Sequence, residues 1–197
     1  MSSQPALFGF GPMTLVSDRE GGIRYWPDIF DADACHHWLH ALMSDVRWKS
    51  EQRPMYDRIV DVPRLQASFD LEDPSCPPLL REMRQGVSAQ IQAPFTHVGL
   101  NFYRDARDSV AMHHDRLQHL VPGAPIAIVS LGATREMWIK PQKGGSTTRV
   151  PLEAGSLLAM SHASQLTHLH GIPKQDGSLA ARISCAFRVR RASSTAH

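Results

Sequence analysis

The second half of the chain consists of short runs of β-branched and aromatic residues separated by turn signals, and this pattern restricts the fold more than any other feature. Glycine-bearing turns lie at Pro122-Gly123, Lys143-Gly144-Gly145, Ala154-Gly155 and Asp176-Gly177. Many short strands at close spacing predict a sandwich, a barrel or a jelly roll. The expected strands are Val98–Tyr103, Val110–His113, Ile126–Leu131, Glu136–Ile139, Arg149–Leu152, Ser156–Met160, Leu166–His170 and Arg182–Val189.

Two helices are expected before these strands. Apolar residues recur at spacings of three and four from Cys35 to Val46, with Asp31 or Asp33 available as the N-cap. A second apolar face runs through Pro78–Ile91, where the prolines suit a first helical turn. Residues 47–74 lie between the helices and show little periodicity, which is typical of a functional or a disordered stretch. The whole pattern predicts a mainly β fold of the α+β class, with the helices covering one outer face.

Length and composition favour a single soluble domain. The chain has 197 residues, and it contains no apolar run of the length (about 18 residues) that would predict a membrane span. The N-terminus lacks the basic start and apolar stretch of a secretory signal. Three widely spaced cysteines, Cys35, Cys76 and Cys185, form no CxxC pair, which favours the reducing cytoplasm. The formal net charge of +2 is weak support for nucleic-acid binding, although it leaves room for a local basic rim. We expect a monomer.

A histidine and an aspartate two residues apart predict part of a metal site. Side chains at this spacing on a strand point to one side, so His113 and Asp115 face together and His114 faces away. Two imidazoles and one carboxylate form the facial triad that holds iron(II) with three positions open. The second imidazole must come from elsewhere in the chain. His168 and His170 share parity on a later strand, so spacing alone does not choose between them.

Two arginines in the last predicted strand indicate an anion site. Arg182 and Arg188 are six residues apart, so they lie on one face of a strand that is otherwise apolar or small. An arginine that points into a β-structure is costly unless an anion meets it, and the guanidinium group matches a carboxylate bidentately. A dicarboxylate cofactor is therefore a candidate ligand, and an outward-facing, solvated pair is the alternative. Asn101 and Tyr103 are also two apart and offer an amide and a phenol to the same interior.

Taken in order, these segments resemble the AlkB family of iron(II)- and 2-oxoglutarate-dependent dioxygenases. The similar segments run across most of the chain and include the family's NxY, HxD and RxxxxxR patterns. They are Tyr25-Trp26-Pro27, Val62-Pro63-Arg64, Asn101-Phe102-Tyr103, His113-His114-Asp115, Ser130-Leu131-Gly132 with Arg135, Gly155–Met160, His170-Gly171-Ile172-Pro173, and Arg182 with Arg188.

The resemblance implies the cofactors and the residues that hold them. It selects His170 over His168, so that His113, Asp115 and His170 are the catalytic ligands of Fe(II). It also implies a 2-oxoglutarate site formed by Asn101, Tyr103, Arg182, Ser184 and Arg188.

The family's fold is a double-stranded β-helix, a form of jelly roll, and the resemblance implies how the chain is divided. We expect this catalytic core over residues 97–191, after an N-terminal extension (23–96) that carries a nucleotide-recognition lid. Residues 1–22 are expected to be an arm, and residues 192–197 a flexible tail. All four segments belong to one structural domain. A short strand is expected within Ile23–Phe30.

The implied activity is oxidative demethylation of alkylated bases in DNA or RNA, with 2-oxoglutarate and O2 consumed and formaldehyde, succinate and CO2 released. The target base would be flipped out or single-stranded. Candidate substrate contacts are Arg64, Phe69, Arg116 and Arg135, with Arg53 and Arg58 as further candidates for phosphate.

One departure from the family pattern concerns the substrate. Many repair members carry acidic residues directly after HxD, whereas Arg116 and Leu117 stand there in this chain. A modified transfer RNA or a protein is therefore the alternative substrate. A jelly-roll protein that holds a metal without turnover is the third possibility, and the intact ligand and arginine sets argue against it.

Overall fold

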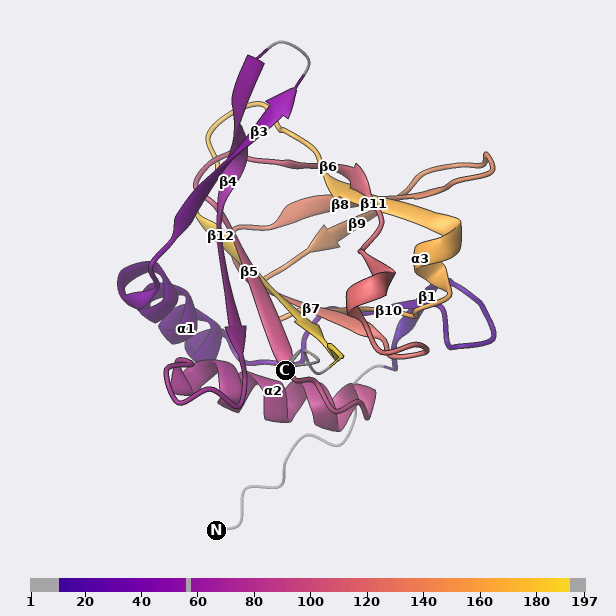
Figure 1. The fold of residues 1–197 in the computed structure, drawn as a ribbon, viewed down its shortest axis with the longest axis horizontal. Helices are drawn as coiled ribbons and strands as arrows, with labels where there is room; N and C mark the ends of the chain where they lie inside the picture. Colours follow the sequence, from indigo (N-terminus) through magenta and orange to yellow (C-terminus); the bar gives the residue numbers. More distant parts are fainter. Residues whose placement is uncertain (1–10, 56–57, 192–197) are drawn as a thin grey trace, which may run out of the picture.

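Two facing β-sheets form the body of the protein (Figure 1). The computed structural model describes residues 11–55 and 58–191, and only the backbone of residues 51–55 and 58–61. In the larger sheet the order of strands is β1 (Met13–Val16), β2 (Ile23–Trp26), β10 (Leu157–Met160), β7 (Ile126–Gly132), β12 (Arg182–Arg188), β5 (His97–Tyr103), β4 (Arg58–Asp70) and β3 (Lys49–Met55). In the smaller sheet the order is β6 (Val110–His113), β11 (His168–Ile172), β8 (Arg135–Pro141) and β9 (Thr148–Leu152).

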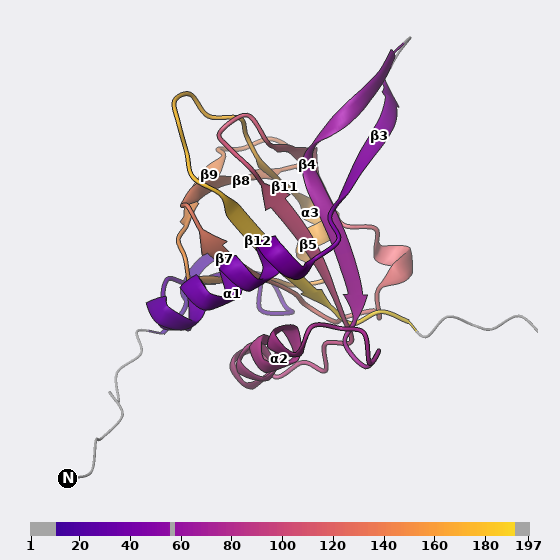
Figure 2. The same cartoon turned by 90° about the vertical axis from the view of Figure 1, so that its left-hand side faces the viewer.

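The two predicted helices pack on the outer face of the larger sheet (Figures 1 and 2). Helix α1 (Ala32–Asp45) begins at Asp31, whose side chain accepts a hydrogen bond of 2.8 Å from the Ala34 amide. Helix α2 spans Pro78–Ile91, as predicted. A short helix α3 (Ser164–Thr167) and a 3₁₀ turn η1 (Leu117–His119) complete the described elements. None of these helices combines the length and apolar character that crossing a membrane would need.

Alternation along β12 separates the core from the site. Ile183, Cys185 and Phe187 are buried in the apolar cluster beneath the helices. Arg182 and Ser184 point the other way, into the space between the two sheets. The central strand of the larger sheet thus contributes apolar side chains to one layer and polar ones to the other.

The stretch 47–74, predicted as irregular, is instead mostly β-structure. Strands β3 and β4 form a hairpin that projects beyond the sheet (Figure 2), and β4 pairs with β5 from Leu65 to Asp70. Pro54 and Pro63 fall within these strands and obscure the alternating pattern in the sequence. Because β2 and β4 pair with β10 and β5, the proposed extension (23–96) and core (97–191) share one sheet, and their functional division stays a prediction.

Other boundaries also differ from the prediction. The predicted strand Leu166–His170 is wrong in its first half, where α3 lies, and β11 begins at His168. The expected arm, residues 1–22, contains β1, and the strand within Ile23–Phe30 ends at Trp26. Residues 1–10 of the arm and the predicted tail (192–197) lie outside the described residues.

Strands β6 and β11 approach closely, which places His113 opposite His170. Gly171 makes this approach possible, since a Cβ atom there would lie 2.9 Å from the Val110 carbonyl oxygen and 3.0 Å from the Met112 sulfur. The two strands that carry the histidines therefore depend on a residue without a side chain.

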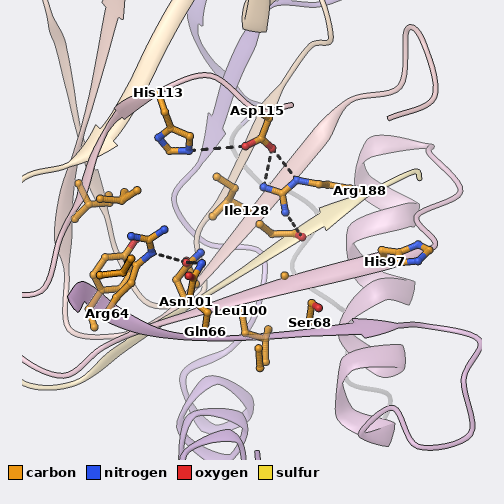
Figure 3. A pocket seen from close by; sticks show the side chains of 18 of the residues that line it. Arg64, Gln66, Ser68, His97, Leu100, Asn101, His113, Asp115, Ile128 and Arg188 are labelled. Atoms are coloured by element: carbon orange, nitrogen blue, oxygen red, sulfur yellow. Dashed lines mark hydrogen bonds and ion pairs between the residues drawn. The ribbon is translucent and has the colours of Figure 1, made fainter. Parts of the chain in front are cut away.

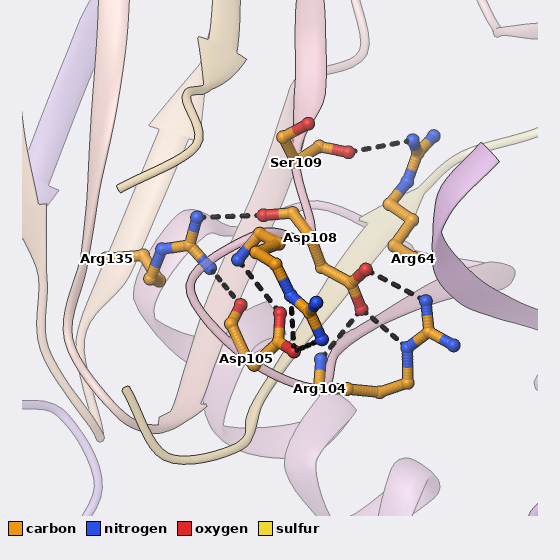
Figure 4. Close-up of polar contacts among 7 residues, drawn as sticks. Arg64, Arg104, Asp105, Asp108, Ser109 and Arg135 are labelled. Atoms are coloured by element: carbon orange, nitrogen blue, oxygen red, sulfur yellow. Dashed lines mark hydrogen bonds and ion pairs between the residues drawn. The ribbon is translucent and has the colours of Figure 1, made fainter. Parts of the chain in front are cut away.

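Arg135 does not lie at an opening where it could contact phosphate, so that prediction is wrong. Its side chain is 1% exposed and donates to the carbonyl oxygens of Asp105 (3.0 Å) and Asp108 (2.8 Å) (Figure 4), and to that of Pro173 (2.7 Å). The first two belong to the loop before β6, and Pro173 directly follows β11. Arg135 thus ties together the two segments that flank the strands of His113 and His170.

Replacing Arg135 with Met should destabilise the fold, because one buried and two partly buried carbonyl groups would lose their donor. We expect the free energy of unfolding to fall by about 2–5 kcal/mol in urea titrations. Arg107→Met is the matched control, since Arg107 lies in the same loop but is exposed, and its side chain hydrogen-bonds, among the described residues, only to the Asp105 carboxylate. Equal unfolding midpoints for the two variants would contradict the role assigned to Arg135.

Candidate metal centre

Three side chains meet at one end of the space between the sheets. His113 ends β6, Asp115 follows two residues later, and His170 lies on β11. One ligand atom from each residue lies within 4.8 Å of those from the other two. The rings of His113 and His170 have centroids 4.4 Å apart. Nε2 of His113 lies 3.8 Å from Oδ1 of Asp115 (Figure 3). Such a set of two imidazoles and one carboxylate suits iron(II).

Hydrogen bonds orient these groups. Nδ1 of His113 lies 2.9 Å from the Ala111 carbonyl oxygen, so a proton there leaves Nε2 available to a metal. The backbone amide of Asp115 donates to Oε1 of Gln165 at 3.0 Å. Gln165 is buried on α3 and had no recognisable signal in the sequence. His168 is not part of the group, and its Nδ1 lies 2.9 Å from the Thr167 hydroxyl.

Charge and burial keep Asp115 and His170 in the state that a cation requires. Burial opposes ionisation of Asp115, but Arg188 and His170 outweigh it and hold the pKa of the carboxyl below its usual value. Arg188 donates to Oδ2 of Asp115 from Nε and from Nη2, each at 2.7 Å. Burial, followed by the neighbouring His113, lowers the pKa of His170 to about 3, so this imidazole is neutral at physiological pH.

The predicted 2-oxoglutarate residues face the same cavity from adjacent strands. Arg182 pairs with Tyr103, and Ser184 with Asn101, across β12 and β5. The cavity has a volume of about 2470 Å³, and all five predicted residues line it together with the three metal-site residues.

Arg182 is the strongest candidate for holding an anion. It is 1% exposed, its Nη2 donates to the Ser130 hydroxyl at 2.9 Å, and its guanidinium lies 5.0 Å from the centroid of the Tyr103 ring. Its Nε and Nη1 have no hydrogen-bond partner among the described residues. Two unpartnered donors on a buried cation fit a carboxylate. Arg188, in contrast, is engaged with Asp115, and its contact to a cofactor stays a prediction.

The predicted substrate contacts are distributed differently from expectation. Arg64 lines the cavity, where its Nε donates to Oδ1 of Asn101 at 2.7 Å and its Nη1 to the Ser109 carbonyl at 3.3 Å (Figures 3 and 4). Arg116 is an exposed residue of the lining. Phe69 packs partly against the core beneath the helices, on the face of β4 opposite Arg64, but it is also among the residues that line the cavity, so its stacking role stays a prediction. The side chains of Arg53 and Arg58 lie outside those that the structure describes.

Comparison with known proteins finds relatives of this chain and one matching family profile. The profile of the 2OG-Fe(II) oxygenase superfamily matches residues 22–193. The mouse alpha-ketoglutarate-dependent dioxygenase alkB homolog 3 is 30% identical, and the match covers 90% of this chain and 73% of that protein. Human DNA oxidative demethylase ALKBH2 is 34% identical over 56% of this chain. That match spans 46%, about half, of ALKBH2.

Solved structures support the predicted jelly-roll class. A 2OG-Fe(II) oxygenase family oxidoreductase from Burkholderia pseudomallei superposes with a TM-score of 0.60 at 16% identity, covering 86% of this chain and 85% of that one. OsALKBH1 superposes with a TM-score of 0.59 at 15% identity, covering 85% and 97%. The mainly β, jelly-roll prediction is therefore confirmed. From the profile and the alkB homolog 3 match, the chain belongs to the 2OG-Fe(II) oxygenase superfamily and, within it, to the AlkB family of dioxygenases.

Proposed function

We propose that this chain uses Fe(II), 2-oxoglutarate and O2 to demethylate alkylated bases in DNA or RNA. The observation that carries the proposal is one cavity that contains both the group of His113, Asp115 and His170 and the unpartnered donors of Arg182. The exposed cationic residues of its lining form what we call the cationic rim: Arg47, Lys49, Arg116, Lys174, Arg190 and Arg191. Relatives named as a DNA oxidative demethylase and as alkB homologs support this choice of substrate.

The charge of the cavity supports a polyanionic substrate. Its described lining contains two carboxylates, Asp45 and Asp115, although the chain as a whole is almost neutral. A local excess of positive charge attracts and orients phosphate groups. The cationic members of the lining are nine in number: Arg47, Lys49, Arg64, Arg116, Lys174, Arg182, Arg188, Arg190 and Arg191.

Each set of residues has a distinct task in the proposed reaction. Iron, bound by the two histidines and Asp115, would supply the oxidising chemistry as 2-oxoglutarate and O2 are converted to succinate and CO2. Arg182 would hold the distal carboxylate of 2-oxoglutarate, and Asn101 and Tyr103 would close the pocket around it. One oxygen atom enters a methyl C–H bond, and the resulting N-hydroxymethyl group separates as formaldehyde while the base nitrogen regains a proton.

A base within a duplex must be flipped out or single-stranded to enter a cavity between two sheets. We further propose that the protein acts as a monomer in the cytoplasm. The three cysteines of the described chain are free and buried, which suits a reducing compartment.

Methylated oligonucleotides test the proposed activity directly. We expect formaldehyde only when Fe(II), 2-oxoglutarate and a methylated DNA or RNA oligonucleotide are all present, and its loss on treatment with a chelator, with recovery on adding Fe(II). Unmethylated oligonucleotides of the same sequence are the control. Succinate release without formaldehyde across DNA and RNA panels would point to a modified transfer RNA or a protein as the substrate.

Replacing His113 or His114 with Ala should have unequal effects. His113 belongs to the metal group, whereas His114 contacts the Asp115 carbonyl through Nδ1 at 3.1 Å. We expect His113→Ala to lower iron-dependent turnover by more than about 100-fold, because loss of a metal ligand should cost more than loss of a residue that only hydrogen-bonds to a ligand. His114→Ala should retain most of the turnover. Equal losses in both variants would refute the assignment of His113.

Arg182→Met should weaken the binding of 2-oxoglutarate. Because the variant removes the buried donors, we expect the KM for 2-oxoglutarate to rise by about tenfold or more, with a smaller change of kcat at saturation. Arg149→Met is the control, since Arg149 is exposed and stacks on Trp138 at 5.1 Å outside the cavity lining. An unchanged KM in a folded Arg182→Met protein would exclude the proposed anion site.

A further inference from the structure

Among the described residues that line the cavity, no carboxylate is free to pair with a base that binds beside the metal centre. Oδ2 of Asp115 is bound by Arg188, and its Oδ1 faces His113 within the metal group. Asp45 is an exposed residue at the end of α1, where it accepts a hydrogen bond from the Ser44 hydroxyl. Neither group is placed to neutralise a positive charge on a base that enters the cavity.

In each of the two chain segments that supply the metal ligands, a cationic side chain follows the ligand. Arg116 directly follows Asp115, is exposed, and lines the cavity. Leu117, the next residue, packs against the apolar cluster between the sheets and offers no polar group. Lys174 also lines the cavity, directly after the Pro173 residue whose carbonyl Arg135 holds. Guanidinium and ammonium groups donate hydrogen bonds and accept none.

Methylated bases fall into two classes that this environment distinguishes. Methylation of adenine at N1 or of cytosine at N3 produces a cation. Methylation of thymine or uracil at N3, or of guanine at N1, leaves a neutral base with at least one carbonyl oxygen beside the methylated nitrogen. Binding of a cationic base is unfavourable here, because the base loses its hydration and comes close to other positive charges. The carbonyl oxygen of a neutral base instead accepts a hydrogen bond from arginine or lysine.

We propose that the site prefers neutral, carbonyl-bearing bases, such as 3-methylthymine, 3-methyluracil and 1-methylguanine, over the cationic bases 1-methyladenine and 3-methylcytosine. This inference rests on the proposed function, and it assigns Arg116 as a residue that determines the preference. The cationic rim still binds the phosphates of either substrate, so the discrimination arises at the base.

Four single-stranded DNA oligonucleotides that differ only in one base test the preference. They carry 3-methylthymine, 1-methylguanine, 1-methyladenine or 3-methylcytosine, and formaldehyde release at low substrate concentration gives kcat/KM for each. We expect at least about a tenfold advantage for the neutral pair. Equal or greater efficiency for the cationic pair would overturn the inference and leave the proposed function intact. Formaldehyde from none of the four, nor from RNA oligonucleotides that carry the corresponding methylated bases, would overturn both.

Charge reversal at Arg116 tests the residue that the inference assigns. In Arg116→Glu we expect the ratio of neutral to cationic kcat/KM to fall by at least about tenfold, and in Arg116→Gln to take an intermediate value. Arg19→Glu makes the same change of charge at an exposed position outside the cavity lining and should keep the parent ratio. Because both kinds of substrate are measured with the same enzyme preparation, the ratio of their kcat/KM values does not depend on the fraction of enzyme that has bound iron. An unchanged ratio in Arg116→Glu would overturn the assignment.

Discussion

The ion pair between Arg188 and Asp115 joins the two sheets at the metal centre, and the arrangement of the site depends on it. Arg188 comes from β12 of the larger sheet, and Asp115 follows β6 of the smaller one. A partly desolvated pair of this kind fixes orientation more than it adds stability, since desolvation offsets much of the attraction. By occupying Oδ2 it leaves Oδ1 facing His113, and so determines where the carboxylate can meet a metal.

The parts of the structure that could be predicted are those with a local periodic signal. Alternation along Arg182–Arg188 predicted which side chains face the interior, and the apolar face and prolines of Pro78–Ile91 predicted α2. The spacing of His113 and Asp115 predicted that their side chains meet, although Asp115 lies beyond the end of β6. The choice of His170 over His168 came from the family resemblance, because two residues of equal parity differ only in their tertiary surroundings.

The parts that escaped prediction depend on contacts between distant segments. Arg135 resembles any surface arginine in the sequence, and only the folded chain brings three carbonyl oxygens to it. Gln165 likewise meets the Asp115 amide across fifty residues of sequence. Strand β4 was missed because Pro63 interrupts its alternation and because its stability comes from pairing with β5. Propensity is a weak guide where tertiary pairing decides the structure.

The buried guanidinium of Arg182 has a consequence for the protein in the absence of cofactor. A fully enclosed cation with two unpartnered donors raises the free energy of the native state, and the face of the Tyr103 ring offsets only part of that penalty. A dicarboxylate that binds there acts as an interior counter-ion and stabilises the fold by mass action. If 2-oxoglutarate binds there, the co-substrate that is consumed in each turnover would also protect the resting enzyme from unfolding, and scarcity of the keto-diacid would shorten the lifetime of the folded protein.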